Sequence, residues 1–247
     1  MHKLRDASLE IILIILIGTL IGATLAIVCN LFVIGVHWFE LQREASTLFS
    51  LNIGDQLLSF SSVIFLWIAA AIVVALKVGF GITRWTGPAD SIYAAHQINE
   101  PLNIKTGLAS TLAAFAAASG GASVGQYGPL VHFGATMGVW VKRFVSSRLT
   151  HEVYLGCGVA AAISAGFNAP IAGVIFAHEA ILRHFSVRTI APITVASISA
   201  SALSHLWFPH SITFEINSLV PPLAEIVPVL AVLAPLFSLI AVCFMWA

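Results

Sequence analysis

The chain has 247 residues, of which 59% are hydrophobic and only 9% are charged, and its mean hydropathy is +0.97. A soluble domain carries about 25% charged residues, so this composition excludes a soluble fold and indicates a chain whose main solvent is lipid. Eleven basic and eleven acidic residues give zero net charge, which leaves no basic surface for nucleic acid. We therefore expect an all-α, polytopic integral membrane protein.

Two long apolar segments predict the first membrane spans. Residues 11–39 contain no Asp, Glu, Lys or Arg, and this length exceeds the roughly 20 residues that cross the hydrocarbon. Gly18 and Gly22 form a small-xxx-small pair within it, which suits close helix packing, unless both glycines are incidental. Residues 57–76 predict the second span.

The charges that flank these spans predict their orientation. Lys3 and Arg5 precede the first span, and Lys77 and Arg84 follow the second, whereas the loop between the spans has mixed charge. Basic segments stay in the cytoplasm, so we expect a cytoplasmic N-terminus, in a bacterial-type inner membrane.

The next apolar segments are interrupted by glycine and proline. Residues 106–141 carry no charge but contain Gly120-Gly121, Gly125 and Gly128-Pro129, and a second break falls at residues 166–170. Unwound backbone at membrane depth is tolerated only where it is buried in protein or lines a cavity, and such breaks mark binding sites in transporters. Broken, re-entrant helices around an internal site are therefore expected.

A helix that starts near Pro129 would suit an anion. Proline favours the first turn of a helix, where free N–H groups and the helix dipole attract negative charge. No Lys or Arg lies between residues 106 and 141, so binding would stay weak enough for release. Two further spans are expected at residues 190–206 and from residue 224 onward.

Three motifs resemble the CLC family of chloride channels and chloride/proton antiporters. Residues 125–132, GQYGPLVH, are similar to its filter motif G-[KR]-E-G-P-x-x-[HQ]. Residues 165–176, AGFNAPIAGVIF, resemble the helix-break-helix that follows, and residues 85–90, WTGPAD, align more loosely with the G-S-G-I-P-E loop. The resemblance assigns residues 1–220 to the first of the family's two inverted repeats and residues 221–247 to the start of a second repeat that is cut short.

The resemblance implies a chloride pathway. Chloride is then the transported ligand, no cofactor or metal is needed, and the protein is a homodimer with a pore in each subunit. Thr86 falls on the family's central serine, whose hydroxyl contacts the anion, although an ordinary loop threonine is the alternative. The filter residues to which the resemblance assigns anion binding or gating are Gly125, Gln126, Tyr127, Gly128 and Pro129.

Two departures from the family pattern bear on the mechanism. The gating glutamate is replaced by Tyr127, whose phenol stays protonated at physiological pH and cannot cycle protons as a carboxylate does. The inner proton-relay glutamate is replaced by Ala180. The loss of both carboxylates favours passive chloride conduction, uncoupled from protons, with Tyr127 at the outer gate or serving as an aromatic wall.

Two other functions stay open. A chloride/proton antiporter would use Glu179 or His178 as its inner relay, although Glu179 is also placed to pair with Arg183 at the membrane boundary. A non-conducting half-protein with a structural or interaction role is the second alternative. His132 is expected to give structural support. The nine histidines show no metal-ligand spacing, and no catalytic motif indicates an enzyme.

Overall fold

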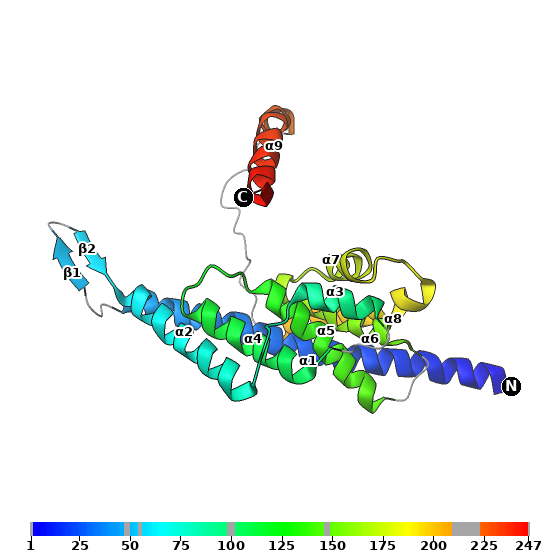
Figure 1. Cartoon of the computed structure of the whole chain (residues 1–247). Coiled ribbons are helices and arrows are strands. Elements are labelled where there is room, and N and C mark those ends of the chain that lie inside the picture. Colours follow the sequence, from blue (N-terminus) through cyan, green and yellow to red (C-terminus); the bar gives the residue numbers. More distant parts are fainter. Residues whose placement is uncertain are drawn as a thin grey trace. The chain divides into compact units, whose positions relative to one another are not determined.

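The computed structural model describes residues 2–46, 50–53, 56–97, 102–145, 149–208 and 223–246. The chain divides into two units, Met1–Pro209 and His210–Ala247. The first unit contains helices α1 to α8 and a short antiparallel ribbon, and the second contains helix α9 (Figure 1).

The described helices of the first unit are α1 (His2–Ala45), α2 (Ser61–Phe80), α3 (Pro88–His96), α4 (Ile104–Ser119), α5 (Tyr127–Phe144), α6 (His151–Phe167), α7 (Pro170–Phe176), the π-helical turn η1 (Ala177–Leu182) and α8 (Val187–Trp207). The ribbon consists of β1 (Ser50–Ile53) and β2 (Gln56–Ser59), and α9 spans Leu223–Trp246.

Four of the described helices are long and apolar enough to cross a membrane. They include residues 11–45 of α1, all of α2, residues 188–207 of α8 and residues 226–243 of α9. This confirms the prediction of a multi-pass integral membrane protein built from helices.

The sequence predicts that the second span starts at residue 57, and this start is wrong. Leu57 and Leu58 belong to β2, where they pair with Asn52 and Leu51 of β1, so α2 begins only at Ser61. The helix continues past Lys77 and ends where Gly81 adopts a left-handed conformation with φ 62°. A long lysine side chain near a helix end reaches the polar boundary, which explains why the charge does not stop the helix.

Both predicted helix breaks are confirmed. Helix α4 ends at Ser119, and the chain passes through Gly121 and Gly125, with φ of 96° and 67°, before α5 begins at Tyr127. Residues other than glycine rarely adopt these backbone angles, because their Cβ atom would clash. Helix α6 ends at Phe167, the next residue Asn168 is left-handed, and α7 begins at Pro170.

The core of the first unit is the crossing of α5 and α6. A Cβ placed on Gly158 of α6 would lie 1.9 Å from the carbonyl oxygen of Gly134 on α5. A Cβ on Gly138 would lie 2.0 Å from the carbonyl oxygen of Tyr154. The two backbones therefore touch, and α6 also packs against α1 and α8.

Helix α1 packs closely on α8, as the glycine pair predicted. A Cβ on Gly18 would lie 2.8 Å from Val195 Cγ1, and one on Gly22 would lie 2.7 Å from the carbonyl oxygen of Ala196. Asn30 adds a hydrogen bond from its amide to Ser204 Oγ at 2.8 Å. Small residues and interhelical polar bonds are the usual means of packing helices in lipid.

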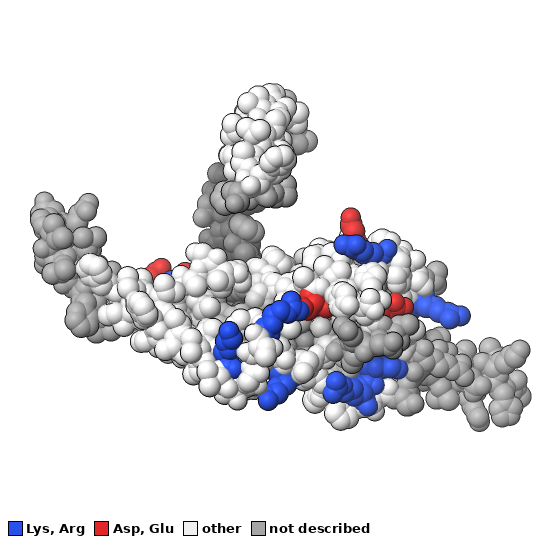
Figure 2. Space-filling view, viewed as in Figure 1, with Lys and Arg blue, Asp and Glu red and all other residues white. Residues whose placement is uncertain are grey.

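Several Lys and Arg side chains lie near the ends of the helices. Most of the described surface in Figure 2 is uncharged. Lys77 lies in the last turn of α2, Lys105 in the first turn of α4, and Lys142 and Arg143 in the last turn of α5. Phe80, Lys105 and Arg143 line one shared hollow, so these three helix ends lie at the same edge.

Candidate functional site

The loop before α3 carries the first group of site residues. Gly87 is extended and caps α3, whose first residue is Pro88. The side chain of Asp90 accepts a hydrogen bond from the Gly87 backbone N–H at 2.8 Å and pairs with the guanidinium of Arg84. These two contacts of one carboxylate hold the turn that presents Thr86.

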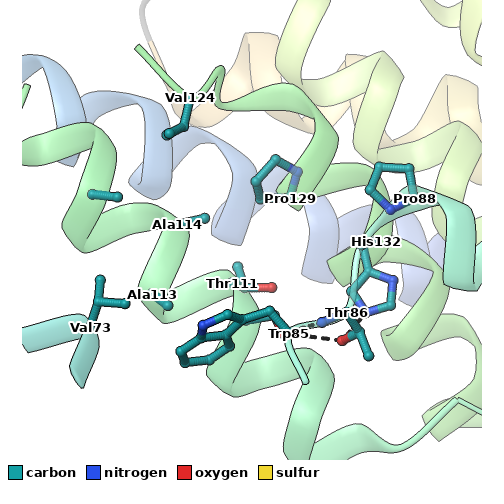
Figure 3. Close-up of a pocket in the computed structure, with 13 residues that line it drawn as sticks. Val73, Trp85, Thr86, Pro88, Thr111, Ala113, Ala114, Val124, Pro129 and His132 are labelled. Atoms are coloured by element: carbon teal, nitrogen blue, oxygen red, sulfur yellow. Dashed lines mark hydrogen bonds between the residues drawn. The ribbon is translucent and has the colours of Figure 1, made fainter. Parts of the chain in front are cut away.

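Thr86 lies in a chain of hydrogen bonds that joins α3, α4 and α5. Its backbone N–H donates to Ser110 Oγ at 3.0 Å, and the two hydroxyl oxygens lie 3.1 Å apart. His132 Nε2 lies 2.9 Å from Thr86 Oγ1. Figure 3 shows the two side chains next to each other. The other ring nitrogen, Nδ1, lies 2.8 Å from Ser91 Oγ.

The Thr86 pocket is a cavity of about 280 Å³ that lies beside these hydrogen bonds (Figure 3). Its polar lining consists of Thr86, Ser110, Thr111 and His132. The rest of its lining is apolar or glycine: Val73, Trp85, Gly87, Pro88, Ala113, Ala114, Ala117, Val124 and Pro129.

The Tyr127 pocket, of about 510 Å³, lies at the start of α5. The Tyr127 ring stacks on Phe167, with ring centroids 3.7 Å apart and planes at 23°. The lining consists of Pro88, Tyr127, Gly128, Val131, Ile163, Phe167, Ala169, Ala172 and Phe176. Pro88 borders both pockets, and a Cβ on Gly128 would lie 3.5 Å from its Cγ, so the N-termini of α3 and α5 meet between the pockets.

The residues predicted for the site are divided between the two pockets. Thr86 and Pro129 line the first pocket, and Tyr127 and Gly128 line the second. Gly125 and Gln126 line neither. Gly125 is exposed, and the buried Oε1 of Gln126 has no hydrogen-bond partner among the described residues.

His178 and Glu179 lie on η1 and outside both pockets. His178 is buried, with Nδ1 2.9 Å from the Val174 carbonyl oxygen and Nε2 3.1 Å from Thr189 Oγ1. Its ring stacks on Phe185 at a centroid distance of 4.9 Å.

The predicted pair between Glu179 and Arg183 does not form in the described structure. The π-helical turn over Ala177–Leu182 places more than 3.6 residues in each turn, so positions four apart no longer align. Arg183 then leaves the helix in a left-handed conformation with φ 57°. Glu179 is exposed, whereas Ala180 packs against the core.

Ser91 and Ser110 are site residues that the sequence did not indicate. They lie 41 and 24 positions from their partners His132 and Thr86, so no local pattern connects them. Neither pocket is lined by Asp, Glu, Lys or Arg in the part of the chain that the structure describes. Within the same residues no group of His, Cys, Asp and Glu is arranged to hold a metal ion.

Comparison with known proteins gives one consistent family. The model of the voltage gated chloride channel family matches residues 82–247. The chain is 25% identical over 122 residues to the voltage-gated ClC-type chloride channel ClcB of Yersinia pseudotuberculosis, covering 49% of this chain and 29% of that protein. It is 29% identical over 184 residues to a chloride channel protein of Torpedo marmorata, covering 69% of this chain and 22% of that protein.

A solved structure shares the fold. The crystal structure of a CLC-type fluoride/proton antiporter matches with a TM-score of 0.72 and 19% sequence identity, covering 90% of this chain and 54% of that chain. The chain thus spans less than a third of the length of these two curated relatives and about half of the solved structure. On the family match and the shared fold, the chain belongs to the voltage-gated chloride channel (CLC) family.

Proposed function

We propose that this protein conducts chloride passively across a membrane, without coupling to protons. The observation that carries the proposal is the absence of Asp, Glu, Lys and Arg side chains from the described lining of both pockets. A pathway without a titrating carboxylate lacks the group that carries the proton in antiporters of the family. A pathway without Lys or Arg does not trap the anion by a full opposite charge.

The N-termini of α3 and α5 supply the attraction for the anion. Both helices begin between the two pockets, at Pro88 and Tyr127, so their partial positive charge faces the same region. In the proposed pathway Thr86 offers its hydroxyl at the central site and Tyr127 forms the outer gate. The filter backbone at Gly125, Gln126, Gly128 and Pro129 completes the start of α5.

The assembly and orientation belong to the same proposal. We infer a homodimer with one pathway in each subunit, as in the family, and a cytoplasmic N-terminus in a bacterial-type inner membrane. Lys105 and Arg143 line one hollow together with Phe80, the last residue of α2. Because basic residues favour the cytoplasmic side, this supports a cytoplasmic location for all three helix ends.

Chloride efflux from liposomes, recorded together with external pH, tests this function. We expect efflux that is driven by the chloride gradient and unaccompanied by proton movement. Proton movement that is stoichiometric with chloride would contradict the proposal. Absence of efflux from well-folded protein would favour a non-conducting structural or interaction role.

A proton-coupled antiporter is the competing function, and the burial of His178 is the observation that favours it. Both ring nitrogens of His178 lie within hydrogen-bond distance of oxygen atoms, and Glu179 is its exposed neighbour. If either residue relays protons, Glu179→Gln or His178→Gln abolishes proton movement and spares chloride flux. Arg188→Gln, which changes an exposed charge on the neighbouring α8, is the matched control.

A further inference from the structure

The hydroxyl group of Ser91 determines which nitrogen of His132 carries a proton. Ser91 is 0% exposed, and among the described residues its Oγ has one hydrogen-bond partner, His132 Nδ1 at 2.8 Å. A buried hydroxyl with a single neighbour donates its proton to that neighbour, because a buried donor without an acceptor is costly. Nδ1 therefore accepts, and the proton of the neutral imidazole lies on Nε2.

The Nε2–H group then donates to Thr86 Oγ1 at 2.9 Å. Thr86 and Ser110 together have two hydroxyl protons, and one of them bridges the 3.1 Å between their oxygens. The other proton has no acceptor among the described protein atoms. Both hydroxyl groups line the Thr86 pocket, so this remaining proton is free to point into it.

The opposite tautomer would remove this donor. With the proton on Nδ1, the Nε2 atom would accept from the Thr86 hydroxyl, and the Ser110 hydroxyl would donate to Thr86 Oγ1. Both protons would then be used within the protein. The pair would present only lone pairs to the pocket, and lone pairs repel an anion.

We propose that His132 is a positioning residue for anion binding, held in its Nε2–H form by Ser91, and that Thr86 and Ser110 act as one donor pair toward the anion. The proposal rests on the proposed anion pathway. It adds Ser110 to the binding group and assigns to Ser91 and His132 the control of its proton arrangement. Neither ring nitrogen of His132 touches the anion in this arrangement.

Nitrogen NMR of the full-length protein, labelled with ¹⁵N-histidine, tests the proton arrangement directly. The His132 signal is identified by its loss in His132→Gln. We expect an unprotonated Nδ1 and a protonated Nε2 at neutral pH. A protonated Nδ1 with an unprotonated Nε2 overturns the proposal, whatever the protein conducts.

Chloride binding to two His132 variants tests the positioning role. The amide of glutamine reaches about as far as Nε2 and supplies an N–H, whereas leucine fills a similar volume without a donor. We expect His132→Gln to keep the chloride dissociation constant close to that of the unaltered protein and His132→Leu to raise it about fivefold to tenfold. Equal affinities in all three proteins overturn the proposal, and thermal unfolding of each variant shows that it is folded.

The two proposals fail differently. Chloride binding that depends on His132, in a protein that shows no efflux, contradicts the conduction function and supports the donor pair. Chloride efflux from a protein whose chloride affinity does not change in the His132 variants supports conduction and contradicts the donor pair.

Discussion

The Tyr127 ring lies almost parallel to the ring of Phe167, with centroids 3.7 Å apart. Tyr127 is the first residue of α5, and Phe167 is the last residue of α6, so the stack joins the two helix breaks. A Cβ on Gly166 would lie 3.2 Å from the Tyr127 ring, which leaves the ring little room on that side. The Tyr127 ring is therefore held against Phe167 where it lines its pocket.

Removal of this ring is expected to open the pathway. Tyr127→Ala should raise chloride efflux severalfold, because it removes the ring that lines the pocket, and should cost about 0.5–1.5 kcal/mol of stability beyond lost burial. Tyr127→Phe keeps the stack and should leave efflux nearly unchanged. Efflux rates from liposomes of equal protein content measure both. Slower efflux in Tyr127→Ala would contradict a gating role.

A carboxylate at this position is expected to make efflux depend on pH. In Tyr127→Glu the side chain is neutral below its pKa, for which the reference value is about 4.3 and burial shifts it upward. Above that pKa the ionised group competes with chloride, so efflux should fall as pH rises. Tyr127→Gln at the same pH values is the control, and equal pH profiles in the two variants would count against the predicted competition.

The crossing of α5 and α6 is expected to tolerate no side chain at Gly158. The atom nearest to an added Cβ is a backbone oxygen at 1.9 Å, which no rotamer change can move. Overpacking costs about 1–3 kcal/mol where side chains adjust, and Gly158→Ala should exceed that range. Size-exclusion profiles and thermal unfolding in detergent measure the loss.

Gly79→Ala is the matched control for this substitution. Gly79 lies in α2, and apart from the adjacent residues and the backbone of its own helix no described atom lies within 4 Å of an added Cβ there. Alanine is favoured over glycine in a helix by about 1 kcal/mol, so this variant should be as stable as the parent or slightly more stable. Equal losses at both positions would mean that the crossing is not the cause.

The carboxylate of Asp90 is expected to matter more than its ion pair with Arg84. Asp90 is one-fifth exposed and accepts from the Gly87 N–H, whereas Arg84 is three-quarters exposed. Loss of a hydrogen bond to a charged group costs about 1.5–3 kcal/mol, and loss of an exposed pair costs about 0–1 kcal/mol. Asp90→Ala should therefore lower the thermal stability and the chloride efflux more than Arg84→Ala, and the reverse order would refute this assignment.

The sequence by itself determined the membrane class, the helix breaks and the family. These depend on local properties: the hydropathy of residues 11–39, the glycines between α4 and α5, and proline at the start of α7. Hydropathy alone did not locate the start of α2, because Leu57 and Leu58 pair across a ribbon, and an apolar dipeptide suits either structure. No local pattern indicated the π-helical turn over Ala177–Leu182, which contacts α6 and α3.

Only the tertiary structure decided which side chains meet at the site. The partners of Thr86 come from α4 and α5, at separations of 24 and 46 residues, and Ser91 reaches His132 from α3 across 41. These contacts form where α3 and α4 pack on α5, and a Cβ on Gly107 of α4 would lie 2.5 Å from Thr136 Oγ1 of α5. Hydrogen bonds act over about 3 Å, so they depend on helix packing that no local pattern in the sequence specifies.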